Sequence, residues 1–281
     1  MSTSEELKNV VREKYAIIAG QTKEQNESSC CGISGCCGTV DYAVFSEAYE
    51  KHEGYVSEAD LGLGCGIPTE FAKINPGDTV LDLGSGAGND CFVARAIVGE
   101  KGKVLGVDFT DQMIAKARAN AEKLGFNNVE FRHGDIEQLP VGGNSIDVVI
   151  SNCVLNLVPD KAKAFGEIFR VLKPGGHFSV SDIVLSGELP EQIKGAAEMY
   201  AGCVSGAIRK ETYIKLLEDA GFINIRIEKE RAIVIPEEIL LSYCSKEELE
   251  KFSDKGKGIF SITVYGEKHK SACCTPGSGC C

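Results

Sequence analysis

The chain has 281 residues, of which 43% are hydrophobic and 25% are charged. This composition is ordinary for a globular protein of one large domain or two modest ones, and it excludes a mostly disordered chain. The chain carries 30 Lys and Arg against 41 Asp and Glu, which gives a formal net charge of −11. Such an excess of negative charge argues against a phosphate-binding face, so we expect no nucleic-acid partner.

The apolar runs of the sequence are short. None approaches the ~20 residues that a membrane-spanning helix needs. The N-terminus is charged and amphipathic and has no apolar segment of the signal-peptide kind. We therefore expect a cytoplasmic protein with no membrane partner, in which the 13 cysteines are thiols rather than disulfides.

The N-terminal part of the chain predicts two helices separated by a cysteine-bearing loop. Apolar residues at helical spacing predict a helix over residues 5–19. The polar, Gly- and Ser-containing residues 20–38 predict a loop. A second short helix is expected over residues 40–50, ahead of the glycine-rich stretch LGLGCGIP at 61–68.

From residue 78 the pattern changes to alternating strands and helices. Strands are predicted at 79–84, 103–108, 129–135, 147–152 and 176–183. Helices are predicted at 90–98, 111–124 and 161–172, and the KPGG segment is expected to end the third of these. Further helices are predicted at 191–201 and 211–220, and further strands at 223–229 and 258–268. This alternation is typical of a parallel sheet with helices on both faces.

A glycine-rich loop lies directly between the first of these strands and its helix. In VLDLGSGAGND (80–90), the glycines let the backbone turn sharply and approach a ligand, and the helix presents free N–H groups. Asp108 ends the next strand, where a carboxylate can accept hydrogen bonds from the two hydroxyls of a ribose. The acidic Asp82 ahead of the loop suits a cationic ligand better than a pyrophosphate.

The loop resembles motif I of class I S-adenosylmethionine-dependent methyltransferases, and GDIEQLP (134–140) resembles their adenine-contacting segment. The resemblance implies an α/β fold of the Rossmann-like class I methyltransferase kind. Its seven-stranded, mainly parallel sheet has helices on both faces, and a smaller C-terminal α+β region is added. Asp135 is expected at the adenine amino group and Ile136 beside the ring. The implied cofactor-binding residues are Asp82, Gly84, Ser85, Gly86, Gly88, Asp108, Asp135, Ile136 and Asn152.

Three single cysteines are predicted around the mouth of this fold. Cys153 directly follows the strand at 147–152, and the carboxyl end of such a strand faces the ligand crevice. Cys65 precedes the first strand, and Cys203 lies in an insertion after the fifth. The alternative for any single cysteine is a small buried hydrophobic residue, and we prefer it for Cys91 and Cys244.

The segments around these thiols resemble arsenite methyltransferases in order and spacing, from about Arg12 to Gly221. They are GLGCGIP, DLGSGAGNDC, ISNCVLNLVPDK, VLKPGG, SDIV and GCVSGA. The resemblance implies that Cys153 and Cys203 hold trivalent arsenic during methylation and that Cys65 takes part in the redox cycle. A further N-terminal cysteine of the family is matched equally by Cys30, Cys31, Cys36 and Cys37. We take Cys37 as the arsenic(III) ligand beside the other three.

The chemistry of arsenic favours this interpretation. Trivalent arsenic is soft, so thiolate sulfur is its natural ligand. Three sulfurs leave a lone pair on arsenic, which can attack the methyl group of S-adenosyl-L-methionine in line. No general base is needed because arsenic carries no proton. Each methylation formally oxidises arsenic, so we expect an external thiol reductant such as thioredoxin or glutathione.

Eight cysteines form adjacent pairs, for which three alternatives stay open. The segments CCGISGCC and CCTPGSGCC can concentrate arsenite or another soft ion, form a zinc site, or carry thiols without a function. Neighbouring cysteines rarely close an unstrained disulfide. The pairs are Cys30–Cys31, Cys36–Cys37, Cys273–Cys274 and Cys280–Cys281.

We expect four regions along the chain. Residues 1–60 cap the site, 61–208 form the cofactor-binding core with the arsenic-site insertion, 209–270 complete the fold, and 271–281 form a mobile cysteine-rich tail. The predicted function is methylation of arsenite for detoxification. Two alternatives are a quinone- or sterol-type small-molecule methyltransferase and a non-catalytic protein that binds soft metals or metalloids.

Overall fold

The computed structural model describes residues 4–28, 49–187, 206–233, 241, 245–247 and 258–270. The strands are β1 (Thr79–Leu83), β2 (Lys103–Asp108), β3 (Val129–His133), β4 (Ile146–Asn152), β5 (Leu172–Ser186), β6 (Phe222–Ile233) and β7 (Gly258–Lys268). The helices are α1 (Ser4–Ala19), α2 (Lys23–Ser28), α3 (Asn89–Val98), α4 (Asp111–Lys123), α5 (Lys161–Val171) and α8 (Lys210–Asp219), with short 3₁₀ helices at Pro68–Glu70 and Leu155–Leu157.

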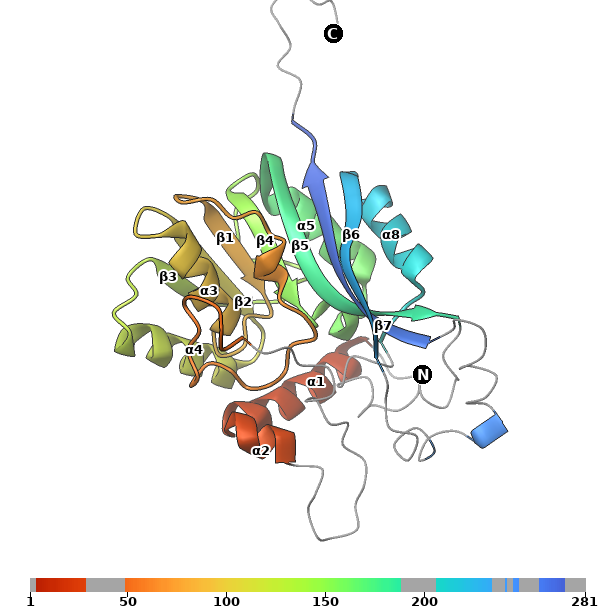
Figure 1. The fold of residues 1–281 in the computed structure, drawn as a ribbon, viewed down its shortest axis with the longest axis horizontal. Coiled ribbons are helices and arrows are strands. Elements are labelled where there is room, and N and C mark those ends of the chain that lie inside the picture. The colour runs from red at the N-terminus through yellow and green to blue at the C-terminus, as the bar shows by residue number, and fades with distance from the viewer. Residues whose placement is uncertain are drawn as a thin grey trace, which may run out of the picture.

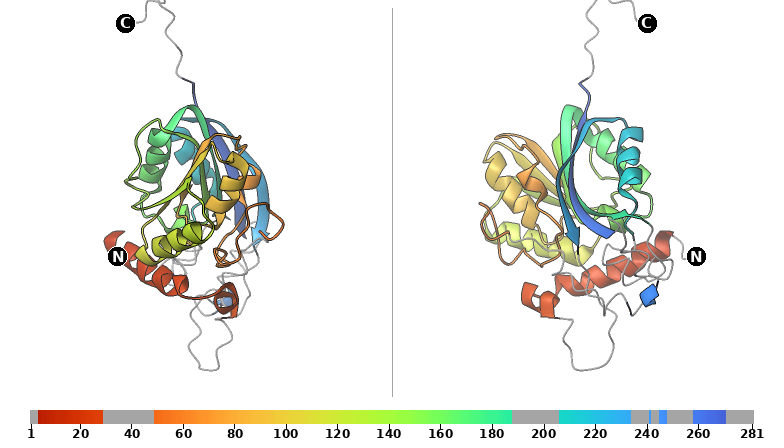
Figure 2. Two further views of the ribbon diagram at one scale, coloured as in Figure 1. Left: turned by 90° about the vertical axis from the view of Figure 1, so that its left-hand side faces the viewer. Right: turned by 45° about the vertical axis from the view of Figure 1, so that its right-hand side comes forward.

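The seven strands form one sheet with helices on both faces, as Figures 1 and 2 show. The strand order is β3-β2-β1-β4-β5-β7-β6. Strands β1 to β5 pair in parallel, whereas β7 runs antiparallel to both of its neighbours. The predicted fold class is therefore confirmed, and β6 and β7 extend the same sheet.

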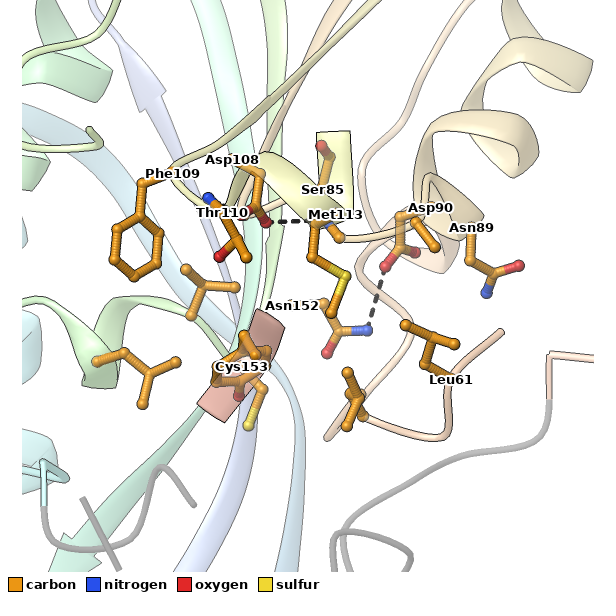
Figure 3. Close-up of a pocket in the computed structure, with 18 of the residues that line it drawn as sticks. Leu61, Ser85, Asn89, Asp90, Asp108, Phe109, Thr110, Met113, Asn152 and Cys153 are labelled. Carbon is orange, nitrogen blue, oxygen red and sulfur yellow. Dashed lines mark hydrogen bonds between the residues drawn. The ribbon is translucent and has the colours of Figure 1, made fainter. Parts of the chain in front are cut away.

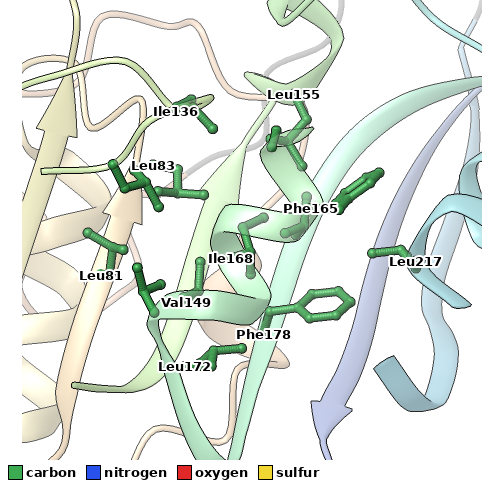
Figure 4. Close-up of a cluster of buried hydrophobic side chains, with 14 of the residues drawn as sticks. Leu81, Leu83, Ile136, Val149, Leu155, Phe165, Ile168, Leu172, Phe178 and Leu217 are labelled. Carbon is green, nitrogen blue, oxygen red and sulfur yellow. The ribbon is translucent and has the colours of Figure 1, made fainter. Parts of the chain in front are cut away.

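Strand alternation separates two hydrophobic cores. In β1, Leu81 and Leu83 pack with the residues of α5 and α8, whereas Val80 packs with those of α3 and α4. Figure 4 shows the first core, in which Phe165 of α5 and Phe178 of β5 are fully buried. Helices on both faces thus fix the strands, so the loops at their carboxyl ends start from a rigid edge.

The structure corrects two of the expected elements. The predicted loop 20–38 contains α2, which begins with a capping box: Gln25 N–H donates to Thr22 Oγ1 at 3.3 Å, and Thr22 N–H donates to Gln25 Oε1 at 2.9 Å. The KPGG segment lies within β5, where the register with β4 shifts, so α5 ends at Val171 and the strand begins at once. Nearly all of the predicted helix 40–50, the whole of 191–201 and the tail 271–281 lie outside the described residues.

Helix α1 crosses the carboxyl edge of the parallel strands (Figure 1). It packs on α4, and Lys116 of α4 donates hydrogen bonds to the carbonyls of Ala19 and Gln21 at 3.0 and 3.2 Å. Cations near the last carbonyls of a helix also interact favourably with its dipole. None of the helices within the described ranges is long and apolar enough to cross a membrane.

Candidate active site

An open pocket of about 1090 Å³ lies at the carboxyl edge of the sheet, lined in part by α1. It brings together loops that follow β1, β2, β3 and β4, which is where parallel α/β sheets bind their ligands. Figure 3 shows Asp108 and Cys153 on this one pocket. The predicted site residues that line it are Gly84, Ser85, Gly86, Asp108, Asp135, Ile136, Asn152 and Cys153.

The glycine loop after β1 forms a tight turn that other residues could not make. Gly84 has a φ of 66°, and a Cβ there would lie 2.5 Å from the side chain of Val154. Gly88 has a φ of 99°, and a Cβ there would lie 2.9 Å from the Phe131 ring. The loop therefore needs glycine for both its backbone conformation and its packing.

Asp108 at the end of β2 is buried and holds the loop in place. Its carboxylate accepts hydrogen bonds from the backbone N–H groups of Gly86 at 3.0 Å and Thr110 at 2.8 Å. Burial raises the pKa of Asp108, and these two bonds oppose the rise. An ionised carboxylate has about four acceptor positions, so two remain for the hydroxyls of a ribose.

The polar atoms of this pocket fit a nucleoside cofactor. Ser85 and Asn89 both line it, and Ser85 Oγ and Asn89 Oδ1 are buried without a hydrogen-bond partner among the described residues. Buried polar groups of native proteins are nearly always hydrogen-bonded, so these two atoms mark places where a polar ligand would bind.

A buried cluster around Asn152 joins the end of β4 to the segment 64–66. Asn152 Oδ1 accepts the Cys65 N–H at 3.0 Å, and its Nδ2 donates to the Gly66 carbonyl at 2.8 Å and to Asp90 at 3.2 Å (Figure 3). The Tyr49 hydroxyl also donates to Asp90, at 3.0 Å. Burial raises the pKa of Asp90 to about 6, against the effect of the Asn152 and Tyr49 hydrogen bonds.

Asp90 and Tyr49 both line the pocket, but neither was among the site residues predicted from the sequence. Asp90 directly follows the glycine loop, and that position was the available signal. Tyr49 carried no signal, because it joins the site through contacts with residues far along the chain.

Removing the Asn152 side chain should destabilise the protein. In Asn152→Ala the buried Cys65 N–H and Gly66 carbonyl lose their partner, and each such group costs about 1–3 kcal/mol. We expect the free energy of unfolding in urea to fall by that amount for each group that water cannot reach. An unchanged free energy would mean that this cluster does not hold the segment 64–66 to β4.

Lys8 of α1 reaches across the pocket to the segment after β3. Its ammonium group lies 2.7 Å from Asp135 and 2.9 Å from Glu137. Burial works against the charged form of Asp135, yet the hydrogen bond and charge of Lys8 leave its pKa below the usual value. The Asp135 carboxylate, which we expect to contact the adenine amino group, is therefore already paired with Lys8 of α1.

The structure separates the predicted thiols. Cys153 lines the pocket in a left-handed conformation, with a φ of 59°, and its N–H donates to the Ser181 carbonyl at 2.7 Å. A non-glycine residue held in this region is strained, which is common at functional sites. Cys65 is fully buried behind the pocket wall, where its carbonyl accepts a hydrogen bond from Ser261. Cys203 and Cys37 lie outside the described residues.

Two of the predicted cofactor contacts do not lie on the pocket surface. Strand alternation turns Asp82 toward α3, where the Cys91 thiol donates to its carboxylate at 3.2 Å. Gly88 forms the N-terminal cap of α3 and packs on phenylalanine rings. Cys91 is a buried core residue, as we expect from the sequence. Within the described part of the chain, no cluster of three or more His, Cys, Asp or Glu could hold a metal ion.

Comparison with known proteins agrees with this geometry. The profile of a family described as a methyltransferase domain matches residues 74–221. An arsenite methyltransferase of Halobacterium salinarum is 40% identical over 276 residues, which cover 94% of this chain and 67% of that protein. The crystal structure of CrArsM, an arsenic(III) S-adenosylmethionine methyltransferase from Chlamydomonas reinhardtii, matches with a TM-score of 0.62 at 35% identity, covering 74% of this chain and 67% of that one.

The fold and the pocket define a class I S-adenosylmethionine-dependent methyltransferase. The chain belongs to the arsenite methyltransferase family. It spans 67% of the Halobacterium relative and between 47% and 66% of four further arsenite methyltransferases. A ubiquinone/menaquinone C-methyltransferase of Cronobacter sakazakii is 31% identical over 177 residues, which cover only 56% of this chain and 70% of that protein.

Proposed function

We propose that this protein transfers a methyl group from S-adenosylmethionine to trivalent arsenic bound by its own thiols. One observation carries the proposal: the Cys153 thiol lies on the same pocket as the glycine loop and Asp108. Similarity to an arsenite methyltransferase over 94% of the chain supports it. The cytoplasm, where thiols stay reduced, is the compartment that we propose for the protein.

The cofactor would lie along the carboxyl ends of β1, β2 and β4. When bound, S-adenosylmethionine supplies a methyl group on a positively charged sulfur. Asp108 would accept the ribose hydroxyls while it keeps the loop folded through Gly86. Asp135 and Ile136 would face the adenine ring from the segment after β3. The remaining predicted contacts, Asp82 and Gly88, would act from behind the pocket wall by shaping the loop.

The thiols would hold the substrate at the other side of the pocket. Cys153 would bind arsenic directly, with Cys203 as the second ligand. Cys65 and Cys37 would take part as further ligands or in the redox cycle, with thioredoxin or glutathione as the reductant. For Cys65 to reach arsenic, the loop that buries it would have to move, since its thiol does not line the pocket.

One assay tests this function against its two alternatives. The purified protein is incubated with arsenite, S-adenosylmethionine and a dithiol, and the products are separated by chromatography with arsenic-specific mass detection. We expect methylated arsenicals that depend on the cofactor. Arsenite binding without a methylated product would instead indicate a soft-metal-binding protein. A quinone-type methyltransferase would methylate a quinol precursor, and Cys153→Ser would leave that activity intact.

Residues 273–281, which lie outside the described residues, give a further prediction. If CCTPGSGCC raises the local concentration of arsenite, deleting it should raise the KM for arsenite and leave kcat nearly unchanged. Substituting its four cysteines by serine in the full chain is the matched variant and should have the same effect. An equal loss of kcat would place these thiols in the redox cycle, and unchanged constants at limiting reductant would leave them without a function.

A further inference from the structure

A fully buried carboxylate lies beside Cys153, on the far side from the glycine loop. Asp182 of β5 is 0% exposed. Its Oδ1 accepts the Ile183 N–H at 3.0 Å, and its Oδ2 accepts the Tyr213 hydroxyl at 3.3 Å. The backbone N–H of Asn156 also donates to the Asp182 carboxylate. A buried charge is expensive unless it is hydrogen-bonded, and this carboxylate has several donors.

The strand pairing places the backbone of Asp182 next to that of Cys153, which lines the pocket. β4 and β5 are paired up to Asn152 and Ser181, and the Cys153 N–H donates to the Ser181 carbonyl. Cys153 is therefore next to Asp182 in the direction across the strands, where neighbouring strands lie about 4.8 Å apart. Asp108, by contrast, ends β2, and Asp90 lies in the first turn of α3, directly after the glycine loop.

The charged and titratable groups that face Asp182 come from α5 and α8. Lys161 of α5 is buried and donates to the carbonyls of Asn156 and Val158, and its charge attracts that of Asp182. Tyr213 of α8 donates to Asp182, and burial together with the charge of Asp182 raises the pKa of Tyr213, with smaller contributions from the Cys65 and Cys153 thiols. Asp182 and the two thiols therefore lie near the buried Tyr213 side chain, where charges act more strongly than in water.

We propose that the negative charge of Asp182 stabilises the positive charge that develops on arsenic during methyl transfer. The inference rests on the proposed function. The arsenic lone pair forms the As–C bond, and the bond from the methyl group to its donor sulfur breaks with the electron pair going to that sulfur. One positive charge thereby moves from the donor sulfur to arsenic. Asp182 does not touch the substrate, and its charge acts through space on the thiol side of the pocket.

The ionisation of Asp182 should therefore appear in the pH profile of the reaction. Burial raises the pKa of Asp182 to about 7, although Lys161 and the hydrogen bonds oppose the rise. We expect kcat to fall as pH decreases through about 7, because the protonated carboxyl group carries no charge. In Asp182→Asn this decrease should disappear. At pH 8.5, kcat should be about tenfold below wild type, equivalent to about 1.4 kcal/mol. Lys161 limits the effect by compensating part of the charge.

A second readout needs no methyl transfer. The charge of Asp182 disfavours a thiolate at Cys153, so Asp182→Asn should lower the pKa of that thiol. Iodoacetamide labelling of the Cys153 peptide, followed by mass spectrometry at pH 8, should become severalfold faster. A merely structural defect would slow the reaction without producing this shift of the labelling profile toward lower pH. Binding of S-adenosylmethionine, measured by calorimetry, should not change.

Two tyrosine variants complete the test. Tyr213→Phe keeps the ring packed on Phe165 but removes the hydrogen bond that lowers the pKa of Asp182, so the acid decrease of kcat should move to higher pH. Tyr265→Phe is the matched control: this buried tyrosine of β7 pairs with Ser179, its hydroxyl donates to Glu267 at 2.9 Å instead of to Asp182, and its substitution should change neither readout.

The melting temperature of Asp182→Asn at two pH values shows whether the variant folds. The folded-state pKa of Asp182 lies above its unfolded value, so the native state loses stability as pH rises from about 4 to 7. Asp182→Asn should therefore melt higher relative to wild type at pH 8 than at pH 5. If Asp182→Asn does not fold, the pH dependence of kcat in Tyr213→Phe tests the inference instead.

An unchanged kcat in Asp182→Asn, or a lower kcat with an unshifted labelling profile, would overturn the inference. If the wild-type protein makes no methylated arsenical, the proposed function fails, whatever the labelling shows.

Discussion

Replacing Cys153 by serine is expected to abolish arsenite methylation, and replacing Cys203 should do the same. Serine offers a hard oxygen in place of soft sulfur, so the variant loses both affinity for trivalent arsenic and the geometry of in-line attack. Among the cysteines that the structure describes, Cys153 is the one that lines the pocket at the carboxyl edge of the sheet. The measurement is the yield of methylated arsenicals at saturating cofactor.

Binding of S-adenosylmethionine should survive both substitutions, which calorimetry can check. Cys91→Ser is a suitable control, because this buried thiol belongs to the core under α3 and does not line the pocket. It should retain most of the activity. More than about a tenth of wild-type activity in Cys153→Ser or Cys203→Ser would make that cysteine structural, since loss of an essential ligand costs far more than 1.4 kcal/mol.

Asp108→Ala is expected to weaken cofactor binding at least tenfold. Ribose hydroxyls left without an acceptor in a desolvated site should cost about 1–3 kcal/mol or more. The structure adds a second cause, because the same carboxylate holds the N–H groups of Gly86 and Thr110. The sequence alone predicts little change in the melting temperature of the cofactor-free protein, whereas these two bonds lead us to expect a lower one.

Two further variants separate the two roles of Asp108. Asp108→Asn keeps one acceptor oxygen, so it should bind the cofactor better than Asp108→Ala while still falling below wild type. Asp111→Ala removes a neighbouring carboxylate whose side chain is 86% exposed, and it should leave the affinity unchanged. Calorimetric titration with S-adenosylmethionine measures all three. Wild-type affinity in Asp108→Ala would refute the ribose assignment.

The sequence by itself determined the parts of this protein that depend on local patterns. Apolar strands that alternate with amphipathic helices predicted the parallel sheet. The strands of such a sheet are covered on both faces, and the helices that cover them carry apolar residues at helical spacing on the side that faces the sheet. The glycine loop and Asp108 could be placed because each directly adjoins a strand end. Cys153 was found for the same reason, since it follows β4 and carboxyl ends of parallel strands share one edge.

Only the tertiary structure decided which side chains reach the pocket and what they contact. Asp82 and Cys65 are near it in sequence, but strand alternation turns Asp82 toward α3, and packing against β7 buries Cys65. Tyr49 joins Asn152 across 103 residues of chain, and Lys8 joins Asp135 across 127. Such pairs leave no periodic trace in the sequence. They form only when the folded sheet brings distant segments together and removes their polar groups from water.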